Sequence, residues 1–180
     1  LAESYSYIDD TTIEIVIRDG IMWPDVDTFV GEAFDIEDVY FTLYAWKYVS
    51  NDKHLWDWIS DMEMIGDDTL MIYVDGDDST PVADAYAPSL PALSTRILPE
   101  HYLNVTQEAD GVTPDITDPN WNSFATNCFG TGLFEIGDFT EGVETVLTVN
   151  PDCWWLDAAV DKSNMDFVNR FGDFTGGLTQ

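Results

Sequence analysis

Apolar and polar side chains alternate in several short stretches of this chain, and that spacing predicts strands. Residues 11–18 alternate with a period of two and are rich in β-branched side chains, which is typical of a strand with one buried face. The stretches 62–65 and 69–74 flank Gly66, Asp67 and Asp68, which predicts a β-hairpin. The stretches 130–136 and 146–149 predict a second hairpin nearer the C-terminus.

Helical spacing follows Asp35. Its side chain can cap a first turn, and Asp38 stands at the third helical position, as in a capping box. Apolar residues then recur every three or four positions: Ile36, Val39, Tyr40, Leu43 and Trp46. A second short helix fits residues 52–59. We therefore expect helices between the strand at 11–18 and the hairpin at 62–74.

The remaining segments are rich in residues that interrupt regular structure. Pro81, Pro88 and Pro91 break the stretch after the first hairpin into short helical pieces, and Asp, Pro and Thr make residues 104–124 a predicted long loop. Strands and helices mix without any internal repeat. This order predicts an α+β (mixed α/β) fold, with helices packed on a mostly antiparallel sheet.

The charge of the chain is strongly negative. It has 35 acidic and 6 basic residues, a formal net charge of −29, and a hydrophobic content of 45%. Nucleic acid is excluded as a partner because no basic stripe could neutralise phosphates. Concentrated salt would screen the self-repulsion, so we expect a halophilic source. An acidic surface without a ligand role is the favoured interpretation, with specific cation sites as the alternative.

The sequence shows no catalytic or metal-binding motif. His54 and His101 stand outside any ligand pattern, so both are predicted to be surface or partly buried structural residues, and no metal or other cofactor is predicted. Residues 75–79 resemble the start of a calcium loop, but Thr80 and Tyr86 occupy the positions that need Gly and a bidentate acid. An ordinary acidic turn is favoured there over cation binding. No Gly-x-Ser-x-Gly motif occurs and neither Cys has an adjacent base, so the chain is predicted not to be an enzyme.

Five motifs along the chain resemble one protein family. The stretches GTGLFEI at 130–136 and NPDCWW at 150–155 are similar to the "GTGPF … NPDYW" hairpin of the peptide- and nickel-type solute-binding proteins of ABC importers. LAES at 1–4, the acidic helix start at 34–41, DDTLMI at 67–72 and ILP at 97–99 match further family motifs in the right order. Leu133 and Cys153 depart from the usual Pro and Tyr, and residues 22–31 are longer and more acidic than the family's turn.

This resemblance implies a fold and a function. Residues 1–160 would form part of the first lobe of a two-lobe periplasmic-binding-protein-like fold, and residues 161–180 a tail leading toward the second lobe. The chain has no signal peptide, no initiator Met and no apolar run of 18 residues, so we expect an excised piece of a longer secreted protein that does not itself span a membrane. The function implied is extracytoplasmic capture of a small solute, most often a peptide, for delivery to an ABC permease. The alternative is a ligand-sensing or surface-structural module that reuses the fold without transport.

The best candidates for ligand contacts are aromatic residues and one arginine: Trp46, Trp56, Trp58, Tyr86 and Arg96. By the resemblance, Trp56 (or Trp58) and Arg96 inherit a role facing the ligand, and Trp56 and Arg96 should lie on one open face rather than in the core. An aromatic plane offers apolar area, and Arg offers a fork for a carboxylate. Core packing for the tryptophans and a structural salt bridge for Arg96 remain alternatives.

The two cysteines, Cys128 and Cys153, are predicted to form a disulfide. If the hairpin is symmetric about residues 138–143, Phe134 faces Leu147 and the two cysteines face each other just outside the strands. The extracytoplasmic compartment implied by the family permits oxidation. Two buried free thiols are the alternative.

Overall fold

The computed structural model describes residues 1–9, 11–26, 29–74 and 95–156. The chain divides into two compact units. The first unit consists of Leu1–Asp19 and Phe34–Ser123, and the second of Gly20–Ala33 and Phe124–Gln180. The predicted lobe boundary at residue 160 stays a prediction, because the described residues end before it.

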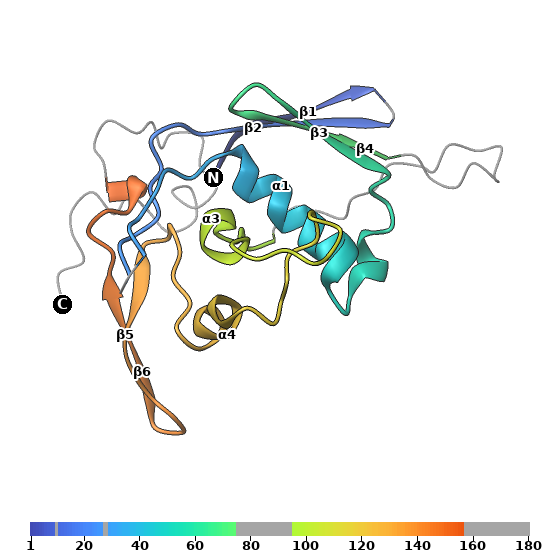
Figure 1. The fold of residues 1–180 in the computed structure, drawn as a ribbon. Helices are drawn as coiled ribbons and strands as arrows, with labels where there is room; N and C mark the ends of the chain where they lie inside the picture. The colour runs from blue at the N-terminus through green and yellow to red at the C-terminus, as the bar shows by residue number, and fades with distance from the viewer. Residues whose placement is uncertain (10, 27–28, 75–94, 157–180) are drawn as a thin grey trace. The chain divides into compact units, whose positions relative to one another are not determined.

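A four-stranded antiparallel sheet forms the base of the first unit (Figure 1). Its strands are β1 (Ala2–Asp9), β2 (Thr12–Ile17), β3 (Asp61–Ile65) and β4 (Thr69–Tyr73), in the order β1-β2-β4-β3. Strand β2 and the β3–β4 hairpin confirm the alternation in the sequence. Strand β1 was matched only to a family motif in the sequence and not predicted as a strand.

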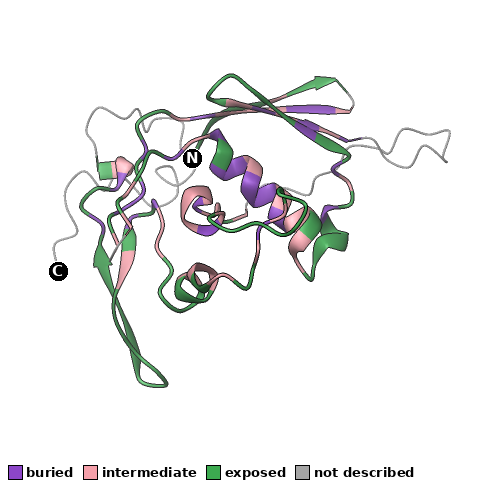
Figure 2. Cartoon of the chain, in the orientation of Figure 1, coloured by how far each residue is buried: buried purple, intermediate pink, exposed green. Residues whose placement is uncertain are grey.

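The core of this unit follows from the register of the sheet. Ile13 on β2 stands opposite Ile72 on β4, and Ile15 stands opposite Leu70, so these four side chains point to one face. Ile13, Leu70 and Ile72 are each 0% exposed. Helix α1 (Ile36–Tyr44) contacts β3 and β4 on the sheet, and its inner face is buried in Figure 2. The helix and the sheet therefore share one hydrophobic core.

Helix α1 begins as the sequence predicts. The Asp35 side chain accepts a hydrogen bond from the Asp38 backbone nitrogen at 3.2 Å, and the Asp38 side chain accepts one from the Asp35 backbone nitrogen at 3.2 Å. This reciprocal pair is a capping box. The helix runs on into a π-helical segment, Ala45–Val49, and the predicted second helix is a 3-10 turn, Lys53–Trp56.

The region after residue 104 differs in part from the prediction. Helix α3 (Glu100–Leu103) precedes a loop, and helix α4 (Pro119–Thr126) occupies the end of the segment predicted to be loop. Asp118 Oδ1 accepts a hydrogen bond from the Asn120 backbone nitrogen at 2.9 Å, and Pro119 stands at the first helical position. An acidic cap followed by Pro is a strong helix start, so the prediction of a loop through residue 124 is wrong.

The second unit contains a long hairpin of β5 (Phe134–Thr140) and β6 (Glu144–Val149). At its base, Asn150 is buried, and its Nδ2 donates to the Gly132 carbonyl at 3.1 Å. The Asn150 backbone nitrogen donates to the Leu133 carbonyl at 2.9 Å. These bonds hold the two motif stretches of the sequence together, before a 3-10 turn at Trp154–Leu156.

Several predictions fall outside the described residues. They are the proline-broken pieces at 75–94, the acidic turn at Asp75, the candidate Tyr86 and the tail at 161–180. Among the helices that the structure describes, none has the length and apolar character needed to cross a membrane.

Candidate functional site

Two polar side chains on α1 fix the segment that carries Arg96. Thr42 Oγ1 donates to the Asp38 carbonyl at 2.7 Å and accepts a hydrogen bond from the Leu98 backbone nitrogen at 2.7 Å. Asp38 Oδ1 accepts one from the Glu100 backbone nitrogen at 2.7 Å. Both side chains are buried, so water does not compete for these hydrogen bonds. The bonds attach the backbone of residues 98–100 to the side of α1.

His101 stands beside the same carboxylate. Its Nδ1 lies 3.8 Å from Asp38 Oδ1, and its side chain is largely buried. This position agrees with the structural role predicted for it. His54 is exposed on the 3-10 turn, which agrees with the predicted surface position.

Three tryptophans stack beside the end of α1. The rings of Trp46 and Trp56 are 5.8 Å apart with an interplanar angle of 24°, and those of Trp56 and Trp58 are 6.3 Å apart at 28°. Trp56 is the middle ring and only 6% exposed. The expectation that Trp56 lies on an open face outside the core is therefore wrong, because a ring on each side covers it. Trp46 and Trp58 are partly exposed.

Arg96 is exposed. It forms no ion pair with another residue in the described part of the chain. Its guanidinium is thus available to solvent at the start of a segment that Thr42 and Asp38 hold in place. An exposed arginine with that support is suited to a carboxylate ligand.

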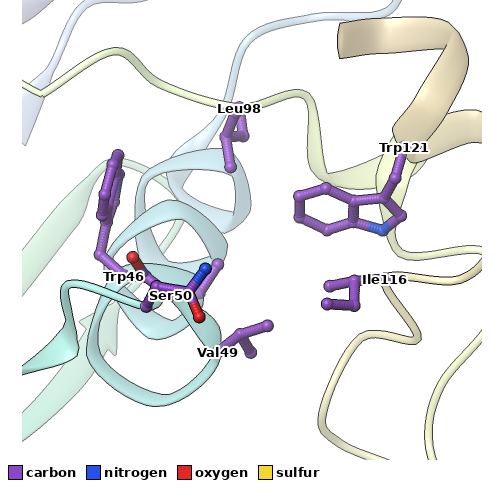
Figure 3. A pocket seen from close by; sticks show the side chains of 8 residues that line it. Trp46, Val49, Ser50, Leu98, Ile116 and Trp121 are labelled. Atoms are coloured by element: carbon purple, nitrogen blue, oxygen red, sulfur yellow. The ribbon is translucent and has the colours of Figure 1, made fainter.

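A cavity of about 410 Å³ opens next to the tryptophan stack, within the first unit. Figure 3 shows Leu98, Ile116 and Trp121 pointing toward the helical turn that carries Trp46 and Val49. Ala45, Ser50 and Asn51 complete the lining. The wall is mostly apolar with a few polar groups, which is the usual character of a small-molecule pocket.

Three indole nitrogens near this cavity are buried. The Nε1 atoms of Trp46, Trp58 and Trp121 are buried and make no hydrogen bond to the residues that the structure describes. A buried N–H without an acceptor costs free energy of folding. Trp46 and Trp121 both line the cavity, so its wall offers aromatic and apolar area.

The sequence found only part of this site. It singled out Trp46, Trp58 and Arg96, but it missed Leu98, Ile116 and Trp121. Trp121 is placed by α4, which the sequence predicted as loop. The Asp118-Pro119 pair was the signal that could have located that helix and its tryptophan.

The predicted disulfide is wrong. Cys128 and Cys153 are both free thiols, the first exposed and the second buried, where its Sγ lies 3.7 Å from the Thr131 carbonyl. Phe134 pairs with Val149 rather than Leu147, so the register differs by two residues from the symmetric hairpin. The observed turn is centred on Gly142, which adopts a φ of 71°. The symmetric hairpin assumed in the prediction had its centre nearer the N-terminus, midway between residues 138 and 143.

In the described part of the chain, no three His, Cys, Asp or Glu side chains are grouped so that they could hold a metal ion.

Residues 1–170 match the sequence family "Bacterial extracellular solute-binding proteins, family 5 Middle". The chain belongs to this family. Family members bind solutes for transport and are not enzymes, which confirms the prediction that this chain is not an enzyme. A search among curated proteins finds no match.

Solved structures of two-lobe binding proteins share the fold. The nickel-histidine complex of NikZ from Campylobacter jejuni is 25% identical over 87% of this chain, with a TM-score of 0.65. DppA from Helicobacter pylori, in complex with the peptide STSA, is 21% identical over 86%, with a TM-score of 0.62. AppA from Bacillus subtilis, in complex with a nonapeptide, is 23% identical over 85%, with a TM-score of 0.59.

This chain covers 28% of NikZ, 30% of DppA and 28% of AppA. The α+β fold is therefore that of a part of a two-lobe solute-binding protein, as the sequence predicted.

Proposed function

We propose that this chain is part of an extracytoplasmic solute-binding protein that captures a peptide and delivers it to an ABC permease. The observation that carries the proposal is the family match over residues 1–170. Two of the similar structures hold peptides, and a third holds nickel with histidine. The mechanism that this family suggests is closure of two lobes around the solute.

The apolar cavity next to the tryptophan stack would receive one side chain of the peptide. Its volume of about 410 Å³ and its lining by Trp46, Trp121 and Leu98 support that role. Trp58 and, through the stack, Trp56 would form the supporting aromatic surface.

Arg96 would bind a carboxylate of the peptide. It is exposed and stands two residues before Leu98, which lines the cavity. A carboxylate would be held by two parallel N–H···O bonds from the guanidinium. The acidic surface of the chain, with its net charge of −29, leaves few other groups that could attract an anion.

Calorimetric titration of the full gene product with a pool of di- to pentapeptides tests the proposal. We expect micromolar or tighter binding, whereas the 180-residue chain alone should bind no tighter than about 100 μM, roughly −5.5 kcal/mol. The reason is that a solute pocket buries most of its ligand, and this chain would supply one wall. Failure of the full product to bind any peptide would overturn the peptide assignment.

Arg96→Gln tests the carboxylate contact, with Arg18→Gln as a control of equal charge. Loss of a charge-assisted hydrogen bond, worth about 1.5–3 kcal/mol, should weaken peptide binding about tenfold to a hundredfold. Peptides with an amidated C-terminus should bind weakly to both the parent protein and Arg96→Gln. Equal effects of Arg96→Gln and Arg18→Gln would remove Arg96 from the site.

Ile116→Phe tests the cavity by filling it. Ile116 is half exposed, so the larger ring should be tolerated, and Val105→Phe in the same loop is the matched control. Binding of peptides with large apolar side chains should weaken more than binding of alanine-rich peptides. A uniform effect on both peptide classes would argue against a side-chain pocket.

A further inference from the structure

A second cavity, of about 280 Å³, lies at the N-terminal half of α1. Glu37, Tyr40 and Tyr44 from the helix form one wall, and Glu100 and Asn104 from the α3 segment form another. It shares no lining residue with the cavity beside the tryptophan stack. Its chemistry also differs, because carboxylates and phenol rings replace the aliphatic wall.

Aromatic rings line the helix side of this second cavity. Tyr40 and Tyr44 stack with centroids 6.4 Å apart and an interplanar angle of 25°, and Phe41 lies between them in sequence. The Tyr44 hydroxyl is 3.2 Å from Thr113 Oγ1, within hydrogen-bond distance, and the Tyr48 ring packs 4.7 Å from Tyr44. The two tyrosines are thus held in place, and ring faces carry the negative end of a quadrupole that attracts cations.

Two carboxylates complete the lining. Asn104 Nδ2 donates to Glu100 Oε1 at 2.7 Å, which holds this lining side chain in place. Glu37 is exposed at the start of α1. The residues that line the cavity include no Lys, Arg or His, so nothing in its wall neutralises these two charges.

The surroundings reinforce this negative character. Burial, followed by the Asp61 carboxylate and the neighbouring tyrosines, raises the pKa of Tyr40 above its ordinary value. The Tyr40 phenol therefore remains neutral at physiological pH. A purely apolar ligand would desolvate the carboxylates without compensation, and an anion would be repelled.

We propose that the cavity formed by Glu37, Tyr40, Tyr44 and Glu100 binds a small organic ammonium ion. The cation would lie against the phenol rings and pair with the carboxylates. This combination of ring faces and negative charge is the arrangement that recognises choline-like groups. The site is separate from the proposed peptide contacts and does not depend on them.

Choline chloride is the probe, and 3,3-dimethyl-1-butanol is its neutral analogue of the same shape. Both are titrated into the 180-residue chain by calorimetry and by NMR, at constant ionic strength maintained with NaCl. We expect saturable choline binding, with NMR shifts at Tyr40 and Tyr44, and no binding of the neutral alcohol. Equal binding of both compounds, or shifts spread over the acidic surface, would overturn the proposal.

Variants separate this site from general attraction to an acidic protein. Tyr40→Leu and Glu100→Gln should each weaken choline binding about fivefold to thirtyfold, whereas Tyr5→Leu and Glu108→Gln outside the cavity should leave it unchanged. Glu37→Gln, at an exposed position, keeps the test valid if Tyr40→Leu fails to fold. Equal losses in Glu100→Gln and Glu108→Gln would show attraction to net charge only and would refute the site. Peptide binding by the full gene product is measured separately, so failure of either proposal is recognised on its own.

Discussion

The four-stranded sheet of the first unit and the β5–β6 hairpin of the second unit differ in how far their apolar side chains are buried. In the first unit, α1 packs on the four-stranded sheet, and Ile13, Leu70 and Ile72 are fully buried. In the described part of the second unit, β5 and β6 form a two-stranded sheet, and Phe139 and Leu147 are 64% and 58% exposed. Figure 2 shows the contrast between the purple segments of β2 and β4 and the mostly green β5–β6 hairpin.

This difference teaches that alternation predicts a strand but not its environment. Both hairpins carry apolar residues at similar spacing, yet among the described residues it is the β3–β4 hairpin that packs against a helix, α1. A two-stranded hairpin is marginal alone in water, and contiguous exposed apolar surface usually marks an interaction site. The similar solved structures are about three times as long as this chain.

The largest expected difference between the two regions is the cost of truncating a leucine. Leu70→Ala should lower the free energy of unfolding by about 2–5 kcal/mol, because it leaves a cavity in the core. Leu147→Ala on β6 should change it by no more than about 0.5 kcal/mol, since that side chain is largely exposed. Urea denaturation measures both, and a similar cost at the two positions would contradict the contrast.

A carboxylate comparison gives a smaller difference. Asp38→Ala removes the buried acceptor of the Asp35 and Glu100 backbone nitrogens, and should cost about 1.5–3 kcal/mol. The control, Glu144→Ala, lies on exposed β6 and should be nearly neutral. If the Asp38 variant unfolds at the same urea concentration as the parent chain, the clamp between α1 and residues 98–100 contributes no stability.

Salt should act on the whole chain rather than on one region. The net charge is −29, so the acidic side chains repel one another and destabilise the folded state. Salt screens this repulsion, because the Debye length falls from about 10 Å at 0.1 M to about 3 Å at 1 M. Thermal melts in about 2 M KCl should therefore show a higher midpoint than melts in 0.1 M KCl. Each kcal/mol of relieved repulsion would raise it by roughly 2–4 °C. An unchanged or lower midpoint would contradict the halophilic interpretation.

The smallest expected effect concerns single carboxyl groups of the loop after α3. A hydrogen bond from Thr106 Oγ1, followed by one from the Asn120 backbone nitrogen, lowers the pKa of Asp118. Thr106→Val should raise that pKa toward its ordinary value, as followed by NMR titration. Because the folded pKa is the lower one, this contribution to stability is present above the unfolded pKa and is lost as pH falls.

Asp110 in the same loop provides the internal control. Its pKa is lowered chiefly by the Val112 backbone nitrogen, with further help from Thr113. Its titration should therefore be the same in Thr106→Val and in the parent chain. A shift of both carboxyls would mean that the substitution rearranged the loop.

Local signals in the sequence predicted much of the fold. The cap at Asp35 located α1, and the turn at 66–68 located the β3–β4 hairpin. These features depend on residues close in sequence, whose conformational preferences are strong. Helix α4 was missed because acidic and Thr-rich composition outweighed the short Asp118-Pro119 signal.

Features that depend on distant partners were harder to predict. The cavity wall joins Leu98, Ile116 and Trp121 to the π-helical segment Ala45–Val49, and no pattern in the sequence connects these positions. The prediction of a disulfide was wrong because it assumed the wrong register for the β5–β6 hairpin. With the turn centred on Gly142, Cys153 no longer stands opposite Cys128. A shift of register changes every cross-strand neighbour.

Peptide capture is the central claim, and the solute retained by the full gene product tests it most directly. The protein would be purified from its source without denaturation, unfolded, and the released molecules analysed by mass spectrometry. The account predicts peptides, enriched in large apolar side chains that would fit the cavity. Release of a sugar or a metal chelate, with no peptide, would contradict it.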